Sequence, residues 1–155
     1  MKTNLEKTTV KDIAYLINTS CLRAPNDMSL EKLAEMLCVS DRYKVYLEDE
    51  ERKLTGVIQS KQIAMKILEL SRRQEDEQEM LPAISYVLNF HCGRDLAEIP
   101  VKVGTGTQLK TVLELMDKNY IREVSVVDEA GCLVGTLEAK NILMHYLHAK
   151  AEASI

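Results

Sequence analysis

The sequence predicts a mixed α/β (α+β) fold built from two copies of a β-α-β-β-α unit, and three observations predict it. First, the 155-residue chain matches itself without gaps when shifted by 79 positions, and 11 of the 39 residue pairs between 30–68 and 109–147 are identical. Second, short stretches of alternating and β-branched apolar residues predict strands. Third, apolar residues recur at helical spacing twice in each copy. An internal repeat of this length indicates two related units.

The second copy shows each element of the unit in order. A strand with alternating apolar residues is followed by a Gly/Thr turn, in which Thr107 is the candidate N-cap of a first amphipathic helix. Two β-branched strands then flank a turn where Gly131 can adopt a positive φ, and a second amphipathic helix ends the unit. These predicted elements lie at residues 101–103, 109–116, 124–127, 133–137 and 142–147.

The first copy follows the same plan, with predicted helices at 30–37 and 63–68 and a hairpin of strands at 45–47 and 54–58. Its turn has Arg52 where the second copy has Gly131, so this residue must adopt another turn type or the left-handed conformation at a modest cost. The turn is highly charged. We expect a solvent-exposed hairpin tip, with an acidic metal site as the alternative.

A segment between the copies has no counterpart in the repeat. Residues 71–79 are polar and are typical of a linker or of a solvent-exposed extension of the preceding helix. Residues 80–88 predict a short apolar helix with Pro82 in its first turn, which either caps one edge of the module or forms a dimer contact. The predicted organisation is therefore a first repeat at 1–71, an insert at 72–94 and a second repeat at 95–155.

Composition limits the possible partners. The chain is 46% hydrophobic and 28% charged with a formal net charge of −4, which argues against binding to nucleic acid or to an anionic membrane. It has neither an apolar run long enough to span a membrane nor the apolar core of a signal peptide near its N-terminus. We therefore expect a cytoplasmic protein without a nucleic-acid or membrane partner.

The chemically reactive side chains do not form a recognisable catalytic or metal motif. The four cysteines lack a C-x-x-C pair and are expected to be reduced thiols. His91, Cys92 and Asp95 are close in sequence, but no fourth ligand follows at a suitable spacing, so we expect no metal site. The absence of a nucleophile elbow and of a Walker loop favours a protein that is not an enzyme.

The second copy resembles the cystathionine-β-synthase (CBS) domain. The resemblance lies in T-x-L-x-x-V-L-x-L-M from Thr107, V-S-V-V-D-E-x-G-x-L-V-G-T-L from Val124 and N-I-L from Asn141. Residues 95–96 look like the segment that precedes the family's first strand, and residues 11–13 are its match in the first copy. CBS domains occur in pairs, so the resemblance implies two repeats packed about a pseudo-two-fold axis in a Bateman module. Such modules commonly form homodimers.

The resemblance also implies a function and a site. CBS pairs usually sense adenine nucleotides in clefts between the paired copies and regulate another protein. Their ribose-binding signature runs from Gly through Thr or Ser to Asp or Asn at the start of the last helix, and here it reads G-T-L-E-A-K-N at 135–141 and G-V-I-Q-S-K-Q at 56–62. The implied ligand-binding residues are Asn141, Glu138, Thr105, Thr107, Lys102, Arg122, Gln62 and Ser60.

Two functions remain open at this point. One is a stand-alone regulatory module that senses AMP, ADP, ATP or S-adenosylmethionine, requires no cofactor and signals to a separate effector protein. The alternative is a ligand-independent dimerisation or interaction protein whose nucleotide clefts have decayed. The candidate residues have structural alternatives as well. Asn141 can bond its own helix backbone, and Glu138 can be a solvent-facing acid near a positive helix end.

Overall fold

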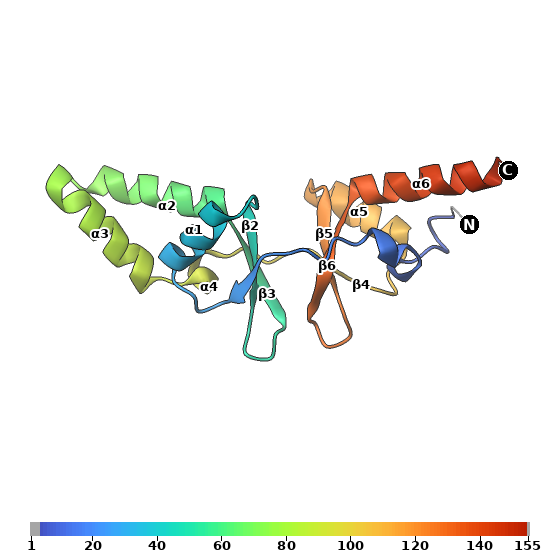
Figure 1. Ribbon diagram of the computed structural model, residues 1–155, viewed down its shortest axis with the longest axis horizontal. Coiled ribbons are helices and arrows are strands. Elements are labelled where there is room, and N and C mark those ends of the chain that lie inside the picture. The colour runs from blue at the N-terminus through green and yellow to red at the C-terminus, as the bar shows by residue number, and fades with distance from the viewer. Residues whose placement is uncertain (1–3, 155) are drawn as a thin grey trace. The chain divides into compact units, whose positions relative to one another are not determined.

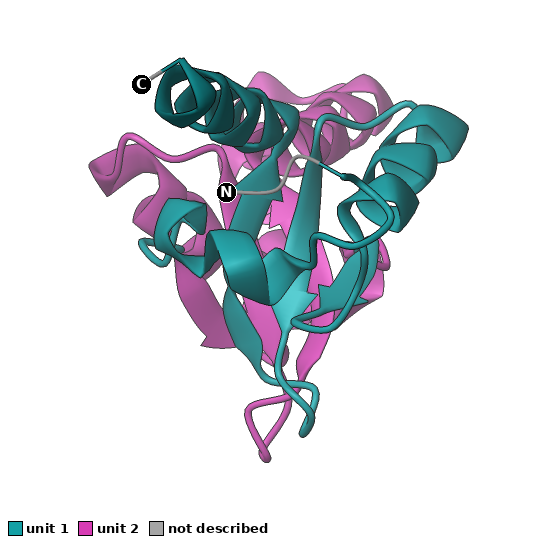
Figure 2. Ribbon diagram, turned by 90° about the vertical axis from the view of Figure 1, so that its right-hand side faces the viewer, with its two compact units in different colours: residues 1–21, 100–155 teal, residues 22–99 magenta. Residues whose placement is uncertain are grey.

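Two small three-stranded sheets, each with helices packed on one face, make up the protein in a computed structural model that describes residues 4–154 (Figure 1). The chain divides into two compact units. Unit 1 contains Met1–Cys21 and Pro100–Ile155, and unit 2 contains Leu22–Ile99 (Figure 2). The outer ends of the predicted repeats, residues 1–3 and 155, lie outside the described residues. The predicted packing of the repeats about a pseudo-two-fold axis stays a prediction.

Unit 2 holds the first repeat and the insert. Its sheet has the order β1-β2-β3, with β1 parallel to β2 and β2 antiparallel to β3. The elements are β1 (Arg23–Pro25), α1 (Leu30–Val39), β2 (Lys44–Glu48), β3 (Leu54–Gln59), α2 (Ser60–Arg73), α3 (Glu77–Phe90) and α4 (Gly93–Leu96).

Unit 1 repeats this plan 79 positions later. Its sheet has the order β4-β5-β6, and Val124 pairs with Leu137 just as Val45 pairs with Ile58 in unit 2. The elements are the 3-10 helix η1 (Val10–Leu16), β4 (Lys102–Gly104), α5 (Leu109–Asn119), β5 (Glu123–Val127), β6 (Leu133–Glu138) and α6 (Ala139–Ala153). The predicted α+β fold with two β-α-β-β-α repeats is therefore confirmed.

Each unit has its own apolar core. Leu33 on α1 and its counterpart Val112 on α5 are fully buried, as are Ile58 and Leu137 on the strands that lead into the last helices. Burying one such aliphatic side chain contributes about 1.5–3 kcal/mol. The apolar stripes that predicted these helices therefore face the cores.

The segments that precede the two repeats are exchanged between the units. We call residues 9–18 and 92–98 the lead segments. Residues 9–18 belong to unit 1, where Val10 N–H donates to the Thr107 carbonyl at 2.9 Å. Residues 92–98 belong to unit 2, where Gly93 N–H donates to the Met28 carbonyl at 2.9 Å. Each repeat is thus completed by a segment that lies outside its own predicted boundaries.

The far ends of the lead segments occupy equivalent places as well. Asn18 forms an isolated antiparallel bridge with Thr136 on β6, and Glu98 forms one with Val57 on β3. The four N···O distances are 2.9–3.0 Å. The internal match at a shift of 79 positions cannot reveal the exchange, because it begins at residue 30 and covers neither lead segment.

Helix α3 differs from its prediction in where it begins. It starts at Glu77, so Pro82 is its sixth residue rather than part of its first turn. Ile84 and Leu88 on α3 are buried in the core of unit 2, and Ser85 Oγ donates to Glu31 Oε1 of α1 at 2.9 Å. Of the two roles that the sequence left open for this helix, capping one edge of a repeat is the one that these contacts describe.

Two turn predictions have definite outcomes. Arg52 adopts the left-handed conformation with φ 64°, where Gly131 has φ 88°. The expectation that Thr107 caps the following helix is wrong, because the N-cap of α5 is Gln108. Thr107 Oγ1 instead accepts a hydrogen bond from Gly104 N–H at 3.1 Å and closes the turn after β4.

Candidate functional site: the start of the last helix in each repeat

The last helix of each repeat begins with the same side-chain arrangement. Strand β3 leads directly into α2, and β6 leads directly into α6. The Gln59 N–H donates to Gln62 Oε1 at 2.7 Å, and the Glu138 N–H donates to Asn141 Oδ1 at 2.7 Å. A side-chain oxygen at this position satisfies one of the N–H groups that lack partners at a helix start. The backbone-bonding role considered for Asn141 is therefore present.

Gln62 makes a second hydrogen bond. Its Nε2 donates to the Leu96 carbonyl at 3.0 Å and so ties the first turn of α2 to the lead segment of unit 2. Asn141 has the same backbone anchor, but its side chain is shorter by one methylene group. The side chains at the two helix starts therefore carry the same amide group but differ in how far that amide extends from the helix.

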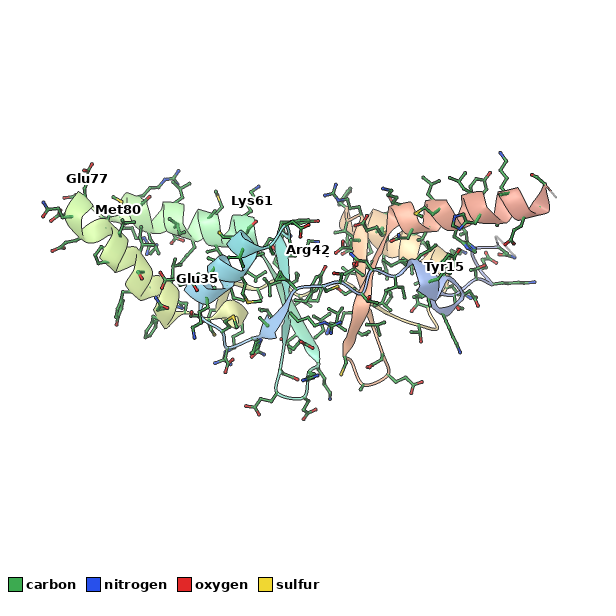
Figure 3. All side chains as sticks on the ribbon, in the orientation of Figure 1. Tyr15, Glu35, Arg42, Lys61, Glu77 and Met80 are labelled. Carbon is green, nitrogen blue, oxygen red and sulfur yellow. The ribbon has the colours of Figure 1, made fainter. Side chains whose placement is uncertain are left out.

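A cavity of about 450 Å³ lies beside Gln62. One wall is α2, and the other is the end of the lead segment. Lys61 projects outward from the first turn of α2 (Figure 3), and Lys66 Nζ lies 3.6 Å from Glu69 Oε2. The lining residues are Gln59, Lys61, Gln62, Met65, Lys66, Glu69, Leu96 and Glu98.

Three of the sequence-predicted site residues lie together in unit 1. Glu138 is the N-cap of α6, Asn141 is three residues further on, and the Arg122 carbonyl accepts from Ala139 N–H at 2.9 Å. Glu123 is the ladder partner of Glu138, which keeps Arg122 at the same end of the sheet. The helix start can therefore contact a polar ligand through its N-terminal N–H groups and the side chains of Glu138 and Asn141.

The other candidates of the second repeat lie elsewhere in unit 1. Lys102 pairs with Ser125 on the sheet, whereas Thr105 and Thr107 follow β4 near Val127. This end of β5 is four residues from the α6 end, about 13 Å away. The carbonyls of Thr105 and Thr107 accept N–H groups of the lead segment at 2.8 and 2.9 Å. The two threonines therefore hold the lead segment and lie away from Asn141.

In unit 2, Ser60 is the exposed first residue of α2, and its N–H donates to the Tyr43 carbonyl at 2.9 Å. Sequence reasoning missed Leu96 and Glu98, which line the cavity beside Gln62. The signal in the sequence was the glycine at position 56. In the structure, a Cβ there would lie 2.9 Å from Ala97 Cβ. A glycine is needed here because the lead segment passes close to the strand.

Each lead segment is capped by an aspartate. Thr9 N–H donates to Asp12 Oδ2 at 2.8 Å, and Cys92 N–H donates to Asp95 Oδ2 at 2.9 Å. These backbone hydrogen bonds hold the pKa of both carboxyl groups below the usual value for aspartate. The Cys92 thiol also donates to Asp95, at 3.4 Å, so part of the His91, Cys92 and Asp95 set is accounted for by this cap. Among residues 4–154, no three His, Cys, Asp or Glu side chains are arranged to hold a metal ion.

The charged turn between β2 and β3 is exposed at Glu50, Glu51 and Arg52. Asp49 Oδ1 accepts the N–H groups of Glu51 and Lys53, both at 2.9 Å. The predicted solvent-exposed hairpin tip is therefore present. Within the described part of the chain, no helix is both long and apolar enough to cross a membrane.

A family model of the CBS domain matches residues 94–148. The second repeat is a CBS domain. The match begins in the lead segment of unit 2, so this part of the CBS sequence packs on the other repeat. No protein of established function in a curated sequence collection matches the chain.

Solved CBS structures share the fold across most of the chain. A CBS domain-containing protein of unknown function from Bacillus anthracis aligns with a TM-score of 0.67 at 18% identity and covers 96% of this chain and 99% of its own. One from Thermotoga maritima aligns with 0.61 at 24% identity, covering 89% and 93%. CBSX2, solved in complex with AMP, aligns with 0.60 at 23% identity, covering 92% and 98%. The CBS-domain fold therefore extends over both repeats.

Proposed function

We propose that this chain is a regulatory CBS-pair module that binds an adenosine-containing ligand and signals to a separate effector protein, without catalysing a reaction. One observation carries the proposal: in a CBS domain, Asn141 is held at the third position of the last helix by a 2.7 Å hydrogen bond from Glu138 N–H. Structures similar in fold support it, since CBSX2 was solved with AMP and a bacterial CNNM/CorC CBS domain with ATP.

The chemistry of this helix start suits a nucleotide. The Asn141 amide can donate to a ribose hydroxyl while its Oδ1 stays bonded to the backbone, and a neutral hydrogen bond contributes about 0.5–1.5 kcal/mol. The helix N-terminus favours the negative charge of a phosphate. Glu138 opposes that charge by about 1 kcal/mol at 4 Å in water. The positive charge of Arg122, whose carbonyl accepts from Ala139 N–H, acts in the opposite direction.

A thermal-shift panel of AMP, ADP, ATP and S-adenosylmethionine tests the proposal. A ligand at 100 times its Kd stabilises the folded chain by about 2.7 kcal/mol, which raises Tm by several degrees for a protein of this size. Asn141→Ala should weaken the responding ligand about three- to tenfold. Asn119→Ala is a matched control, because Asn119 Nδ2 bonds the Leu115 carbonyl on α5. The absence of a shift with every ligand would contradict nucleotide sensing.

The alternative, a dimerisation protein, is favoured by exposed apolar residues on the two last helices, where Ile67 and Leu68 on α2 match Tyr146 and Leu147 on α6. Met65, Ile67 and Leu68 on α2 are 37–49% exposed. Leu143, Tyr146 and Leu147 on α6 are 50–58% exposed. We propose that these stripes contact a second copy, since a stable interface buries about 800 Å² per partner and draws on apolar surface.

The oligomeric state tests the dimer directly. Leu68→Glu with Leu147→Glu should turn a dimer into a monomer in light scattering, whereas Leu81→Glu on α3, at a more exposed leucine, serves as the control. A wild-type monomer at micromolar concentration would contradict the homodimer. The four free cysteines fit a reducing compartment, so we propose a cytoplasmic location.

A further inference from the structure

We infer that the outer face of helix α3 is the surface on which the effector protein docks, through a short helical segment that carries lysine or arginine beside its apolar side chains. The inference rests on the proposed function and deepens it, because it names the kind of partner to which the module signals. Helix α3 belongs to the insert, which has no counterpart after the second repeat's last helix.

The inner face of α3 packs within unit 2. Ile84 and Leu88 are buried in its core. Ser85 Oγ and the Asn89 amide both donate to the carboxylate of Glu31 on α1. These contacts hold α3 in one rotation about its own axis. A partner that binds the outer face therefore meets side chains on a helix that is already ordered, which lowers the entropy cost of binding.

The outer face of α3 carries Pro82, Tyr86 and Phe90, which we call the outer stripe. They recur every four residues and so lie on one side of the helix. Tyr86 and Phe90 are each 72% exposed, and their rings stack at 6.3 Å between centroids with an interplanar angle of 16°. A cavity of about 440 Å³ lies along the outer stripe. Exposed aromatic side chains beside a hollow are typical of the anchor points of protein interfaces.

The size of the outer stripe favours a short segment over a second copy of the chain. Its two aromatic side chains offer about 300–500 Å² of contact area. A stable interface between folded proteins buries about 800 Å² per partner. From Pro82 to Phe90 the outer stripe extends about 12 Å along the helix axis, which a single partner helix can cover with apolar residues at helical spacing.

The charge beside the outer stripe favours a basic partner. Four exposed carboxylates, which we call the acidic group, lie at the start of α3: Glu75, Asp76, Glu77 and Glu79. Glu77 projects away from the helix (Figure 3). Residues 74–93 contain no lysine or arginine. The nearest cations, Arg72 and Arg73, end α2, and Arg73 Nη2 is paired with Glu69 Oε1 at 2.6 Å. A second copy would bring the same carboxylates, whereas a basic segment complements them.

The first turns of α3 also present hydrogen-bond acceptors. Pro82 has no N–H, so the carbonyl of Gln78 lacks the donor that a helix normally supplies four residues later. Glu79 lies on the side of the outer stripe, three residues before Pro82. Lysine and arginine donate hydrogen bonds and accept none, and a guanidinium can also stack on the ring of Tyr86. An anionic lipid or a nucleic acid would instead be repelled by the acidic group.

Selection from a random display library of peptides of about 16 residues, long enough to form a helix, tests the inference. The wild-type chain is the bait. We expect the enriched peptides to combine lysine or arginine with apolar residues at helical spacing. In fluorescence anisotropy, Tyr86→Ala with Phe90→Ala should weaken their binding at least tenfold. Leu81→Ala is the matched control, because Leu81 is 77% exposed on the same helix but does not line the cavity.

The acidic group is tested separately. Replacing Glu75, Glu77 and Glu79 by glutamine should weaken the same peptides at least threefold at low salt, and the difference from the wild type should shrink as salt is added. Asp76 is left unchanged because its side chain accepts from Gln78 N–H as the N-cap of α3. Circular dichroism checks that every variant is folded.

Several outcomes would overturn the inference. These are a selection that enriches no peptide, one that enriches acidic peptides, and peptides that bind the variants as tightly as the wild type. Loss of self-association in Tyr86→Ala with Phe90→Ala would assign the outer stripe to a second copy, and loss of binding to phosphatidylserine vesicles would assign it to a membrane. The thermal shift with AMP, ADP, ATP and S-adenosylmethionine should be the same in this double variant, so nucleotide sensing stands or falls independently.

Discussion

The two repeats place the same strands and helices 79 positions apart, yet their lead segments approach the sheets differently. In unit 1, a Cβ on Gly135 would collide with the backbone of Asn18 and lie 2.7 Å from Ile17 Cγ2. In unit 2, a Cβ on Gly56 would meet the Ala97 side chain at 2.9 Å and the Glu98 carbonyl at 3.4 Å. The lead segment of unit 1 thus passes closer. The side-chain bonds to the two lead segments also differ: Gln62 Nε2 on α2 donates to the Leu96 carbonyl in unit 2, whereas His148 on α6 bonds the Tyr15 hydroxyl in unit 1. Backbone symmetry alone therefore does not give two equivalent sites.

The largest expected effect tests whether the two units unfold in one cooperative transition. Ile58→Ala and Leu137→Ala each remove a fully buried aliphatic side chain at matching positions and should cost about 3 kcal/mol. Because each unit includes a lead segment from the other repeat, we expect one urea transition that either variant lowers by a similar amount. A two-step circular-dichroism curve in which only one step moves would show that the exchange does not couple the units.

The glycine pair should separate the two lead segments. Gly135→Ala forces the backbone of Asn18 to move and should cost about 3 kcal/mol. Gly56→Ala meets mainly a methyl group and should cost about 1 kcal/mol. Urea unfolding of both variants measures the difference. Equal losses would contradict the closer approach in unit 1.

The two hairpin turns should respond in opposite directions. Gly131→Ala puts a Cβ on a residue with φ 88° and should lower the free energy of unfolding by about 1 kcal/mol. Arg52→Gly relieves φ 64° and should raise it by up to about 0.5 kcal/mol, because the added freedom of the unfolded chain offsets part of the gain. A loss of stability in Arg52→Gly would point to a contact made by the Arg52 side chain.

The smallest effect is expected in acid. Backbone hydrogen bonds lower the folded-state pKa of Asp12 and Asp95. Their stabilisation is therefore present above the unfolded-state pKa of about 4 and is lost as the pH falls through the lower folded-state values. Asp12→Asn and Asp95→Asn should each flatten the loss of stability below pH 4 in urea titrations. An unchanged acid limb in both variants would contradict the cap role.

Sequence alone predicted most of the elements, because the spacing of apolar residues is a local signal and the internal match gave each element a second copy for comparison. It predicted the hairpins and the last helices of both repeats, together with the turn choice open to Arg52. It missed β1, since Arg23–Pro25 has no alternating apolar pattern. It did not show in which unit each lead segment packs, because a segment's packing partner is a long-range property that its own residues do not encode.

The candidate site was predicted less completely. The resemblance directed attention to Asn141 and Gln62, and the structure adds that the two amides have the same backbone anchor. The resemblance could not show that Thr105 and Thr107 lie at the other end of the sheet, because their position depends on the strand register. Leu96 and Glu98 were missed for a related reason: they reach the cavity beside Gln62 only through the exchange.

The lead-segment exchange also bears on how such a chain can arise. A half-length polypeptide with one lead segment and one β-α-β-β-α unit could satisfy its sheet only by folding the lead back or by giving it to an identical neighbour. In this chain the second arrangement occurs within one polypeptide, because each repeat packs against the lead segment that precedes the other repeat. Cutting the chain between the repeats would therefore yield two fragments, each of which carries the lead segment that the other repeat needs. Such fragments should recover their structure only when they are mixed.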